Sequence, residues 1–205
     1  MSSKTVRFMD AFFECDLDLS LTLDAEGKQA EVVAGNIERI SLDLHSYGFN
    51  GSVQLSSYGN QDLDGAFNST KVTKITLTFK PTDPLLGTAP LLEIKGIITR
   101  KLFKRTDAIG ENKEQSIRLY ELAFLDAAQA VWSEHFPVNI YVDESMKDIL
   151  DKHKNSDISI KYNFKALEDK HPITAFSLGY KDSLSEEQQV SFYSFLMWYL
   201  HQEEG

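Results

Sequence analysis

Apolar and polar residues alternate along much of the first 126 positions. In the clearest run, Phe13 to Leu23, the odd positions are apolar or cysteine and the even positions are acidic or hydroxylated. Side chains alternate between two faces along a strand, so this run is predicted to have one buried and one wet face. The same reasoning predicts further strands at Ile40–Leu44, Val53–Leu55, Ile75–Phe79, Leu92–Ile98 and Ile117–Phe124. The last of these is apolar on both faces, which favours a place inside a sheet.

Turns and loops are predicted between these strands from glycine, proline and charged residues. They are a turn at Asp24–Gly27, the end of a strand at Tyr47–Gly51, a polar loop at Ser56–Thr70, a proline-bounded connection at Pro81–Pro90 and a charged hairpin loop at Arg105–Glu114.

The pattern changes after Asp126. It predicts a helical turn at Ala127–Trp132, a strand at Val138–Val142, a helix capped by Ser145 with Asp148 three residues on, and strands at Ile158–Phe164 and Phe176–Tyr180. A closing helix over Val190–Leu200 follows, with Ser183 and Ser185 as cap candidates. This helix is apolar around almost its whole circumference, which indicates burial or a packing partner. The predicted fold class is therefore α+β and predominantly antiparallel β, with a smaller α/β piece after Asp126.

Charge and composition narrow the function classes. The chain has 31 acidic and 21 basic residues and a net charge of -10, so repulsion opposes binding to nucleic acid or anionic lipid. The longest basic stretch, Arg100 to Arg105, is interpreted as the end of a strand. No apolar run reaches the roughly 20 residues that span a bilayer, and the N-terminus has no signal-peptide pattern. Folding in the cytoplasm without membrane insertion is expected.

Candidate catalytic chemistry is sparse, and no catalytic, cofactor or metal site is predicted. Cys15, the sole cysteine, falls on the apolar face of the first strand and is interpreted as a small core residue. The histidines are expected at surfaces or helix ends, since none has zinc-binding spacing: His45, His135, His153, His171 and His201.

Two acidic patterns need weighing. Asn60-x-Asp62-x-Asp64-Gly65 resembles a calcium loop, but its twelfth position is Lys71 rather than Glu, so a solvated loop is favoured. Glu14, Asp16 and Asp18 line the polar face of the first strand. Neighbouring carboxylates can act as acid and base, but a hydrated acidic face is favoured here.

Several segments between Leu85 and Gly205 resemble a known family in order as well as in residues. They are Leu85-Leu-Gly87, Leu92-Glu-Ile-Lys-Gly-Ile-Ile-Thr99, Leu119–Phe124 with Ala127–Trp132, Ile140-Tyr-Val-Asp-Glu-Ser-Met-Lys-Asp-Ile-Leu150, Tyr180 with Asp182, and the aromatic helix ending in Gln202-Glu-Glu-Gly205. This order resembles the hub region of phage tail hub proteins and type VI secretion spike (VgrG-like) proteins. Asp182 replaces the Glu of the family, Leu184 to Val190 look inserted, and Tyr199 stands where Arg is usual.

The resemblance implies a tube-like β-barrel hub domain over residues 1–126 and the start of a second α/β hub domain over 127–205. It further implies a homotrimer that joins the tail tube to the central spike, with tail-tube and spike-tip proteins as partners. Such a structural part needs no catalytic residues or cofactors. It is assembled in the cytoplasm and exported or injected with the apparatus.

Two alternatives stay open from the sequence. One is a monomeric β-barrel or sandwich that binds a small ligand or carbohydrate through aromatic residues, for which Phe12, Phe13, Tyr47 and Phe49 are candidates. The other is an enzyme whose site has no recognisable motif, which clustered carboxylates or histidines around one pocket would favour.

Overall fold

The computed structural model describes residues 4–6, 15–45, 47–57, 61–82, 92–108, 116–156, 158–160, 162, 165–177 and 190–203. These residues form a mostly antiparallel β structure with four α-helices. The chain divides into two compact units. The first comprises residues 1–45 and 49–126, and the second comprises residues 46–48 and 127–205.

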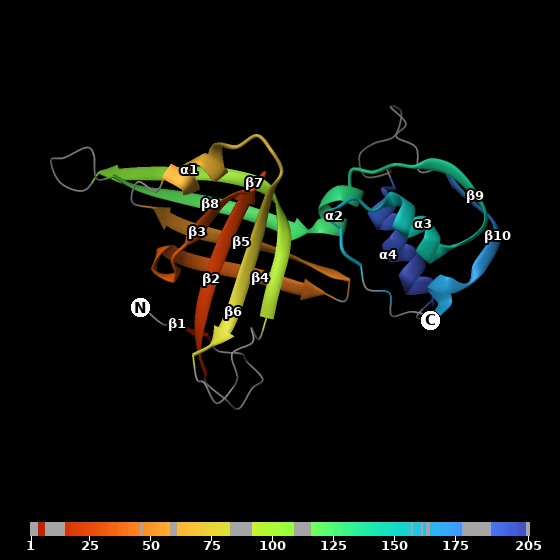
Figure 1. Cartoon of the computed structure of the whole chain (residues 1–205), viewed down its shortest axis with the longest axis horizontal. Coiled ribbons are helices and arrows are strands. Elements are labelled where there is room, and N and C mark those ends of the chain that lie inside the picture. Colours follow the sequence, from red (N-terminus) through yellow and green to blue (C-terminus); the bar gives the residue numbers. More distant parts are fainter. Residues whose placement is uncertain are drawn as a thin grey trace. The chain divides into compact units, whose positions relative to one another are not determined.

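The first unit is built on one eight-stranded sheet. Its strands are β1 (Lys4–Val6), β2 (Cys15–Ala25), β3 (Lys28–Val32), β4 (Ile37–His45), β5 (Gly48–Ser57), β6 (Thr73–Pro81), β7 (Leu92–Ala108) and β8 (Ser116–Asp126). Their order is β1-β2-β6-β7-β8-β5-β4, and β3 pairs with β2 on the same edge as β1. Figure 1 shows the sheet strongly curved, with β2 and β6 running across the direction of β8.

The antiparallel, β-rich part of the fold prediction is confirmed, but closure into a barrel is not. Within the described residues, the strand order ends at β4 on one side and at β1 and β3 on the other, and no ladder joins these ends. The short 3-10 turn Ala34–Asn36 links β3 to β4 along the chain. A closed tube therefore stays a prediction.

The apolar positions of the alternating strands converge in one core. Leu21 and Leu23 of β2, as predicted, are almost completely buried, and the residues that share the core come from seven strands and a helix. They include Val53, Leu55, Leu63, Ile75, Leu77, Tyr120, Leu122 and Phe124. Burial of aliphatic side chains contributes about 1.5–3 kcal/mol each, so this cluster is the main source of stability of the unit.

The segment predicted as a polar loop at Ser56–Thr70 instead contains helix α1 (Gln61–Asn68). Leu63 and Ala66 of α1 are buried in the core, and Phe67 packs against it. Their spacing of three and four residues is the helical signal that the polar neighbours obscured. Strand β3 was also not predicted, although its Ala30 and Val32 are buried.

Strand β7 is longer than predicted and changes its facing at a bulge. Residues 105–108, assigned to a charged loop from the sequence, continue the strand. Up to Ile98 the even positions face the core, but a register shift between Ile98 and Arg100 turns the odd positions Lys101 and Phe103 to that side, opposite Leu122 and Tyr120. Figure 1 shows β7 and β8 as a long hairpin passing α1.

The bulge divides the basic stretch of β7 between the two faces. Arg100 and Lys104 both bind Glu121 of β8, at 3.4 and 2.9 Å, and Gln54 donates to it at 3.2 Å. The hydrogen bond from Lys104, and then that from Gln54, lower the pKa of Glu121. Arg100 and Lys104 are both at least half exposed, in agreement with an exposed strand end, and each is paired with Glu121.

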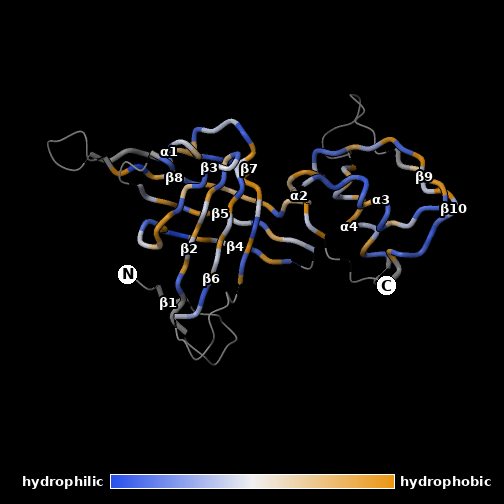
Figure 2. The backbone as a smooth tube through the Cα atoms, viewed as in Figure 1, coloured by the Kyte–Doolittle hydropathy of each residue, from blue (hydrophilic) through white to orange (hydrophobic). Residues whose placement is uncertain are grey.

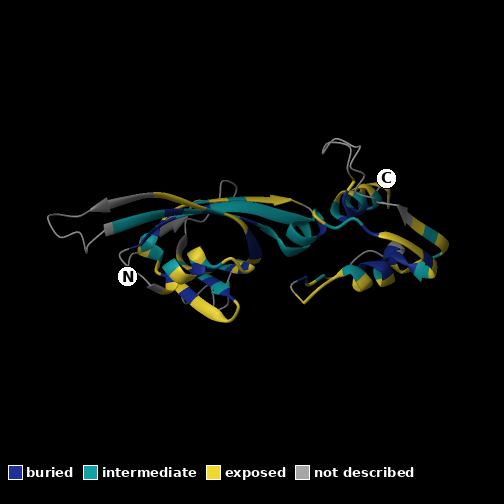
Figure 3. Ribbon diagram, turned by 90° about the horizontal axis from the view of Figure 1, so that it is seen from above, coloured by how far each residue is buried: buried dark blue, intermediate teal, exposed yellow. Residues whose placement is uncertain are grey.

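The second unit packs helices on one side of a two-stranded antiparallel sheet. Its elements are α2 (Ala127–Trp132), β9 (Val138–Ser145), α3 (Met146–His153), a 3-10 turn at Lys165–Glu168, β10 (Lys170–Ser177) and α4 (Phe192–Glu203). Trp132, Ile149 and Phe192 are completely buried at the centre of its core. Figure 3 shows buried positions interleaved with exposed ones in this unit.

The structure bears on three sequence predictions for this unit. Ser145 caps α3 in a reciprocal capping box with Asp148, as predicted, and the hydrogen bonds from Ser145 lower the pKa of Asp148. A strand at Ile158–Phe164 is wrong for the described part, since residues 158–160 are outside any strand. The cap of α4 is Ser191, whose Oγ accepts from Ser194 N at 3.1 Å, whereas Ser183, Ser185, Leu178 and Tyr180 lie outside the described residues.

Candidate functional site

Among the described residues, exposed apolar side chains gather on the outer side of the sheet in the second unit. Strand β9 exposes Val138 by 67%, Ile140 by 72% and Val142 by 64%. The register sets Ile173 of β10, 68% exposed, opposite Val142, and the exposed Ala175 opposite Ile140. These five residues, termed here the β9–β10 face, form one continuous apolar surface on neighbouring strands. Figure 2 shows apolar colouring along β9.

On the opposite side of β9, Asn139 and Asp143 are exposed, and Tyr141 is the residue that packs into the core of the unit. Tyr141 lies between Ile140 and Val142 and is only 6% exposed. Its hydroxyl contacts His153 Nε2 of α3 and accepts a hydrogen bond from Asn139 Nδ2 at 3.1 Å. The sequence correctly predicted a strand with Val138, Ile140 and Val142 on one face, but that face is not the one turned to the core.

A chain of hydrogen bonds continues from Tyr141 through two histidines. His153 Nδ1 lies 2.7 Å from His135 Nε2, and both rings pack against Phe192 of α4. Burial, and then the proximity of His135 and Lys152, lower the pKa of His153. One neutral tautomer of His153 satisfies both contacts, because it accepts from Tyr141 and donates to His135. His153 is the last residue of α3, which agrees with the predicted helix-end position, and both histidines are half-buried rather than exposed at a surface.

Charged residues border one end of the β9–β10 face and pair within the same chain. Lys152 forms an ion pair with Glu144, and Lys170 lies 3.5 Å from Asp143. The border therefore carries both signs in equal number. The middle of the face has no ionisable side chain.

The calcium-loop candidate is overturned by the structure. Asp62 and Asp64 belong to helix α1, not to a loop that could wrap a cation, and Asn60 lies outside the described residues. Asp64 forms an ion pair with Arg118 and a hydrogen bond with the hydroxyl of Tyr120, both from β8. Burial and the bond to Asp64 raise the pKa of Tyr120 to about 12. The Asp64 carboxylate therefore links α1 to strand β8 of the sheet.

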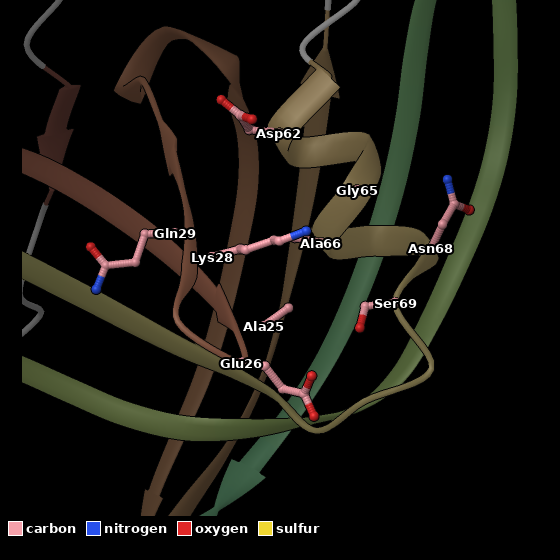
Figure 4. A pocket seen from close by; sticks show the side chains of 9 residues that line it. All are labelled: Ala25, Glu26, Lys28, Gln29, Asp62, Gly65, Ala66, Asn68 and Ser69. Carbon is pink, nitrogen blue, oxygen red and sulfur yellow. The ribbon is translucent and has the colours of Figure 1, made fainter.

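A hollow of about 460 Å³ lies between α1 and the turn that joins β2 to β3. Figure 4 shows Glu26, Lys28 and Asp62 around it, together with the backbone of Gly65 and Ala66. Glu26 Oε1 lies 3.1 Å from Lys71 Nζ, and both side chains are 62% exposed. Across the part of the chain that is described, no group of three or more His, Cys, Asp or Glu residues is placed to hold a metal ion.

The remaining candidates from the sequence do not converge on one site. Asp18 is exposed on β2 opposite Lys80 of β6 in the register, which suits a hydrated face, while Glu14 lies outside the described residues. Cys15 and Asp16 are in β2, and their side chains are not described. Tyr47 packs against the core of the second unit, and Phe49 packs against the core of the first. Phe12 and Phe13 lie outside the described residues.

No family model matches the chain, and no curated protein matches it significantly. Solved structures do. A chain of the lidded Francisella PdpA–VgrG complex aligns with 91% of this chain at 17% identity and a TM-score of 0.64, over 26% of its own length. A chain of the lidless complex aligns with 91% of this chain at 16% identity and a TM-score of 0.64, over 31% of its own length. The 43 kDa tail protein of prophage MuSo2 from Shewanella oneidensis aligns with 90% at 12% identity and a TM-score of 0.50, over 50% of its length.

At these identities the likeness establishes the fold. The chain has the fold found in a phage tail protein and in a VgrG complex, and it spans between a quarter and a half of the length of those chains. Among the described residues, no helix is long and apolar enough to cross a membrane.

Proposed function

We propose that this chain is a structural hub segment of a contractile injection apparatus, of the phage tail baseplate or type VI secretion kind, which joins the tail tube to the central spike. The observation that carries the proposal is the fold similarity to a chain of the PdpA–VgrG complex, at a TM-score of 0.64 over 91% of this chain. The ordered hub-like segments from Leu85 to Gly205 support it independently, because they come from the sequence rather than from the backbone.

In this proposal residues 1–126 form the tube-like β-barrel hub domain, and residues 127–205 begin the second hub domain. The outer face of β2 and β6 suits a wall that faces water. The register places Asp18 opposite Lys80 and Asp24 opposite Lys74, with hydroxyl residues between them. Opposite charges on facing strands stabilise a sheet modestly and keep its surface hydrated. The polar face is thus suited to contact with water.

Assembly is the second element of the proposal. Three copies form a ring, with tail-tube proteins on one side and spike-tip proteins on the other, and the ring is built in the cytoplasm before export with the apparatus. Strand β4 lies at one end of the sheet order and exposes Leu44 by 57%. Terminal strands of this kind offer unpaired backbone groups for contact with further subunits. The part works by geometry, without a reaction of its own.

The experiment mixes the purified chain with the tail-tube protein encoded in the same gene cluster. Light scattering of the chain alone over a dilution series is expected to give three times the chain mass of 23.2 kDa. Sedimentation of the mixture is expected to carry the chain down with the assembled tube. A mixture of the chain with bovine serum albumin is the control for non-specific association. A chain that neither forms a trimer nor sediments with the tube would refute the hub assignment.

A further inference from the structure

We propose that the contact between His135 and His153 is a pH-sensitive switch, which holds the start of α4 against the end of α3 near neutral pH and releases it in mild acid. The switch lies within the second unit and goes beyond the hub assignment, on which it does not depend. The effector is the proton, and the part that is released is the first turn of α4, which begins at Phe192.

Three segments of the second unit meet at this pair of histidines. His135 follows α2, and its carbonyl oxygen accepts a hydrogen bond from the backbone N–H of Phe192 at 2.8 Å. His153 ends α3, and its carbonyl oxygen accepts from Trp132 Nε1 of α2 at 3.0 Å. The rings of both histidines pack against the ring of Phe192, with centroids 5.7 and 4.7 Å away. A change at the pair therefore acts on α2, α3 and α4 together.

The distance between the two rings limits how many protons the pair can hold. His135 Nε2 lies 2.7 Å from His153 Nδ1, so a single N–H lies between them and one of the two nitrogens must be an acceptor. A protonated imidazole carries an N–H on both of its nitrogens. If both rings were protonated, two donors and two positive charges would face each other at this distance. Proton uptake by both histidines therefore requires the rings to separate.

An added proton also has no direct counter-charge at the pair. The charged and titratable side chains beside the two histidines are Tyr141 and Glu144 of β9, Lys152 of α3 and Glu134 of the segment after α2. Glu144 is paired with Lys152, Glu134 is exposed, and α4 contributes the uncharged ring of Phe192. Among the described residues, no carboxylate forms an ion pair with either histidine. Burial, and then the proximity of the other histidine and of Lys152, lower the pKa of His153.

Acid therefore favours the released form. A histidine freed from the contact takes up a proton near its ordinary pKa of about 6.5, whereas His153 in the intact contact takes one up only at lower pH. The held form is fully favoured above about pH 6.5, and it is lost as the pH falls from there through the folded pKa. Because two histidines take part, the loss with falling pH is steeper than one proton would produce.

The test follows hydrogen exchange of the Phe192 backbone N–H by NMR in the whole chain, because its hydrogen bond to His135 is broken in the released form. The protection factor is the intrinsic exchange rate at each pH divided by the measured rate. Between pH 7.5 and pH 5.0 it is expected to fall about tenfold or more. The N–H of Leu77, in the central strand β6 of the first unit, is the internal reference and is expected to keep its protection.

Variants then assign the change to the pair. His135→Gln and His153→Gln each remove one site of proton uptake and leave a side chain that can form hydrogen bonds. Each is expected to reduce the fall in protection, and the double variant is expected to abolish it. His201→Gln, at an exposed histidine of α4, is the matched control and is expected to leave the fall unchanged.

A second measurement covers the case in which the glutamine variants do not fold. The imidazole resonances of the unchanged protein are followed from pH 7.5 to pH 5.0. Those of His135 and His153 are expected to titrate in the pH range in which Phe192 loses its protection.

Four results would overturn the inference. One is a Phe192 protection factor that does not change with pH, and another is a fall that persists in the double variant. An equal fall at Leu77 would assign the effect of acid to the whole chain. If both histidines become protonated while Phe192 stays protected, the pair carries its charge without releasing α4.

Discussion

The two units place the same kind of strand pattern in opposite ways. In β2 of the first unit, the apolar residues Leu21 and Leu23 turn into the core, and the polar positions between them are more exposed. In β9 of the second unit, Ile140 and Val142 turn to solvent, and Tyr141 between them is buried. Alternation specifies a strand with two unlike faces in both cases. Which face is covered depends on the layers that pack against it.

The units also differ in how they satisfy buried polar groups. The first unit uses permanent charges: Asp64 with Arg118, and Lys101 with backbone carbonyls. The second uses hydrogen bonds that run from Tyr141 through His153 to His135. We therefore expect the first unit to be complete in itself, whereas the second has an uncovered apolar face and an ionisable core.

The largest effects are expected from deleting core side chains, one in each unit. Leu77 and Ile149 are completely buried, and each change to alanine should cost about 2–5 kcal/mol. Leu77→Ala should lower the midpoint of the far-ultraviolet circular dichroism transition in urea, which follows the large sheet. Ile149→Ala should instead lower the transition in tryptophan fluorescence, because Trp132 and Trp198 both lie in the second unit.

This pair also tests the division into residues 1–126 and 127–205. If the units fold independently, each variant moves one transition and leaves the other in place. Equal shifts of both transitions in both variants would show a single cooperative fold and would remove the comparison drawn above.

The next prediction tests how tightly the side chains of the first unit are packed. A Cβ at Gly51 would lie 2.5 Å from Phe124 Cζ and 2.8 Å from the carbonyl oxygen of Ser41, whereas one at Gly65 of α1 meets nothing within 4 Å. Gly51→Ala should therefore lower the free energy of unfolding by about 1–3 kcal/mol, as overpacking does. Gly65→Ala should raise it by roughly 0.5–1 kcal/mol, because alanine favours a helix interior. Two changes of the same sign would argue against this packing.

A third prediction contrasts two lysines of the first unit. Lys101 Nζ donates to the carbonyl oxygens of Ala66 and Ser69, both at 2.9 Å, and to Thr73 Oγ1 at 2.7 Å, at the end of α1. Lys101→Ala leaves these acceptors without their cation and should cost about 1–3 kcal/mol in urea denaturation. Lys71→Ala breaks only the exposed pair with Glu26 and should cost at most about 1 kcal/mol. Equal costs would mean that Lys101 has no special role.

Much of the first unit could be predicted from the sequence, because each buried strand face is also the apolar face. Helix α1 could not, since Asp62, Asp64 and Asn68 dominate its composition and only Leu63, Ala66 and Phe67 carry the helical spacing. The face of the sheet on which Lys101 lies could not be predicted either. A single extra residue in β7 reverses it, and no local residue type signals the bulge.

Only part of the candidate site could be predicted from the sequence. The sequence located Val138, Ile140 and Val142 on one face of a strand but assigned that face no role. The histidine pair was missed because His135 and His153 are 18 residues apart and meet only through the packing of α3 against the segment after α2. Spacing rules detect ligands on one element, whereas this contact is tertiary.

The smallest predicted effect depends on pH and is confined to the second unit. The pKa of His153 is lower in the folded protein than its ordinary value near 6.5, chiefly through burial. The unfolded chain therefore takes up a proton at higher pH than the folded one. The stability that this neutral histidine contributes is complete above about pH 6.5 and is lost as the pH falls from there through the folded pKa.

Urea denaturation followed by tryptophan fluorescence at pH 7.5 and pH 5.5 should show this loss in the unchanged protein, and a smaller one in His153→Gln. His45→Gln, which changes an exposed histidine of the first unit, should leave the difference between the two pH values as it is. The circular dichroism transition of the first unit should show no change that depends on His153. A loss of stability in acid that persists fully in His153→Gln would assign the effect to other groups, and the ionisable core would no longer distinguish the second unit from the first.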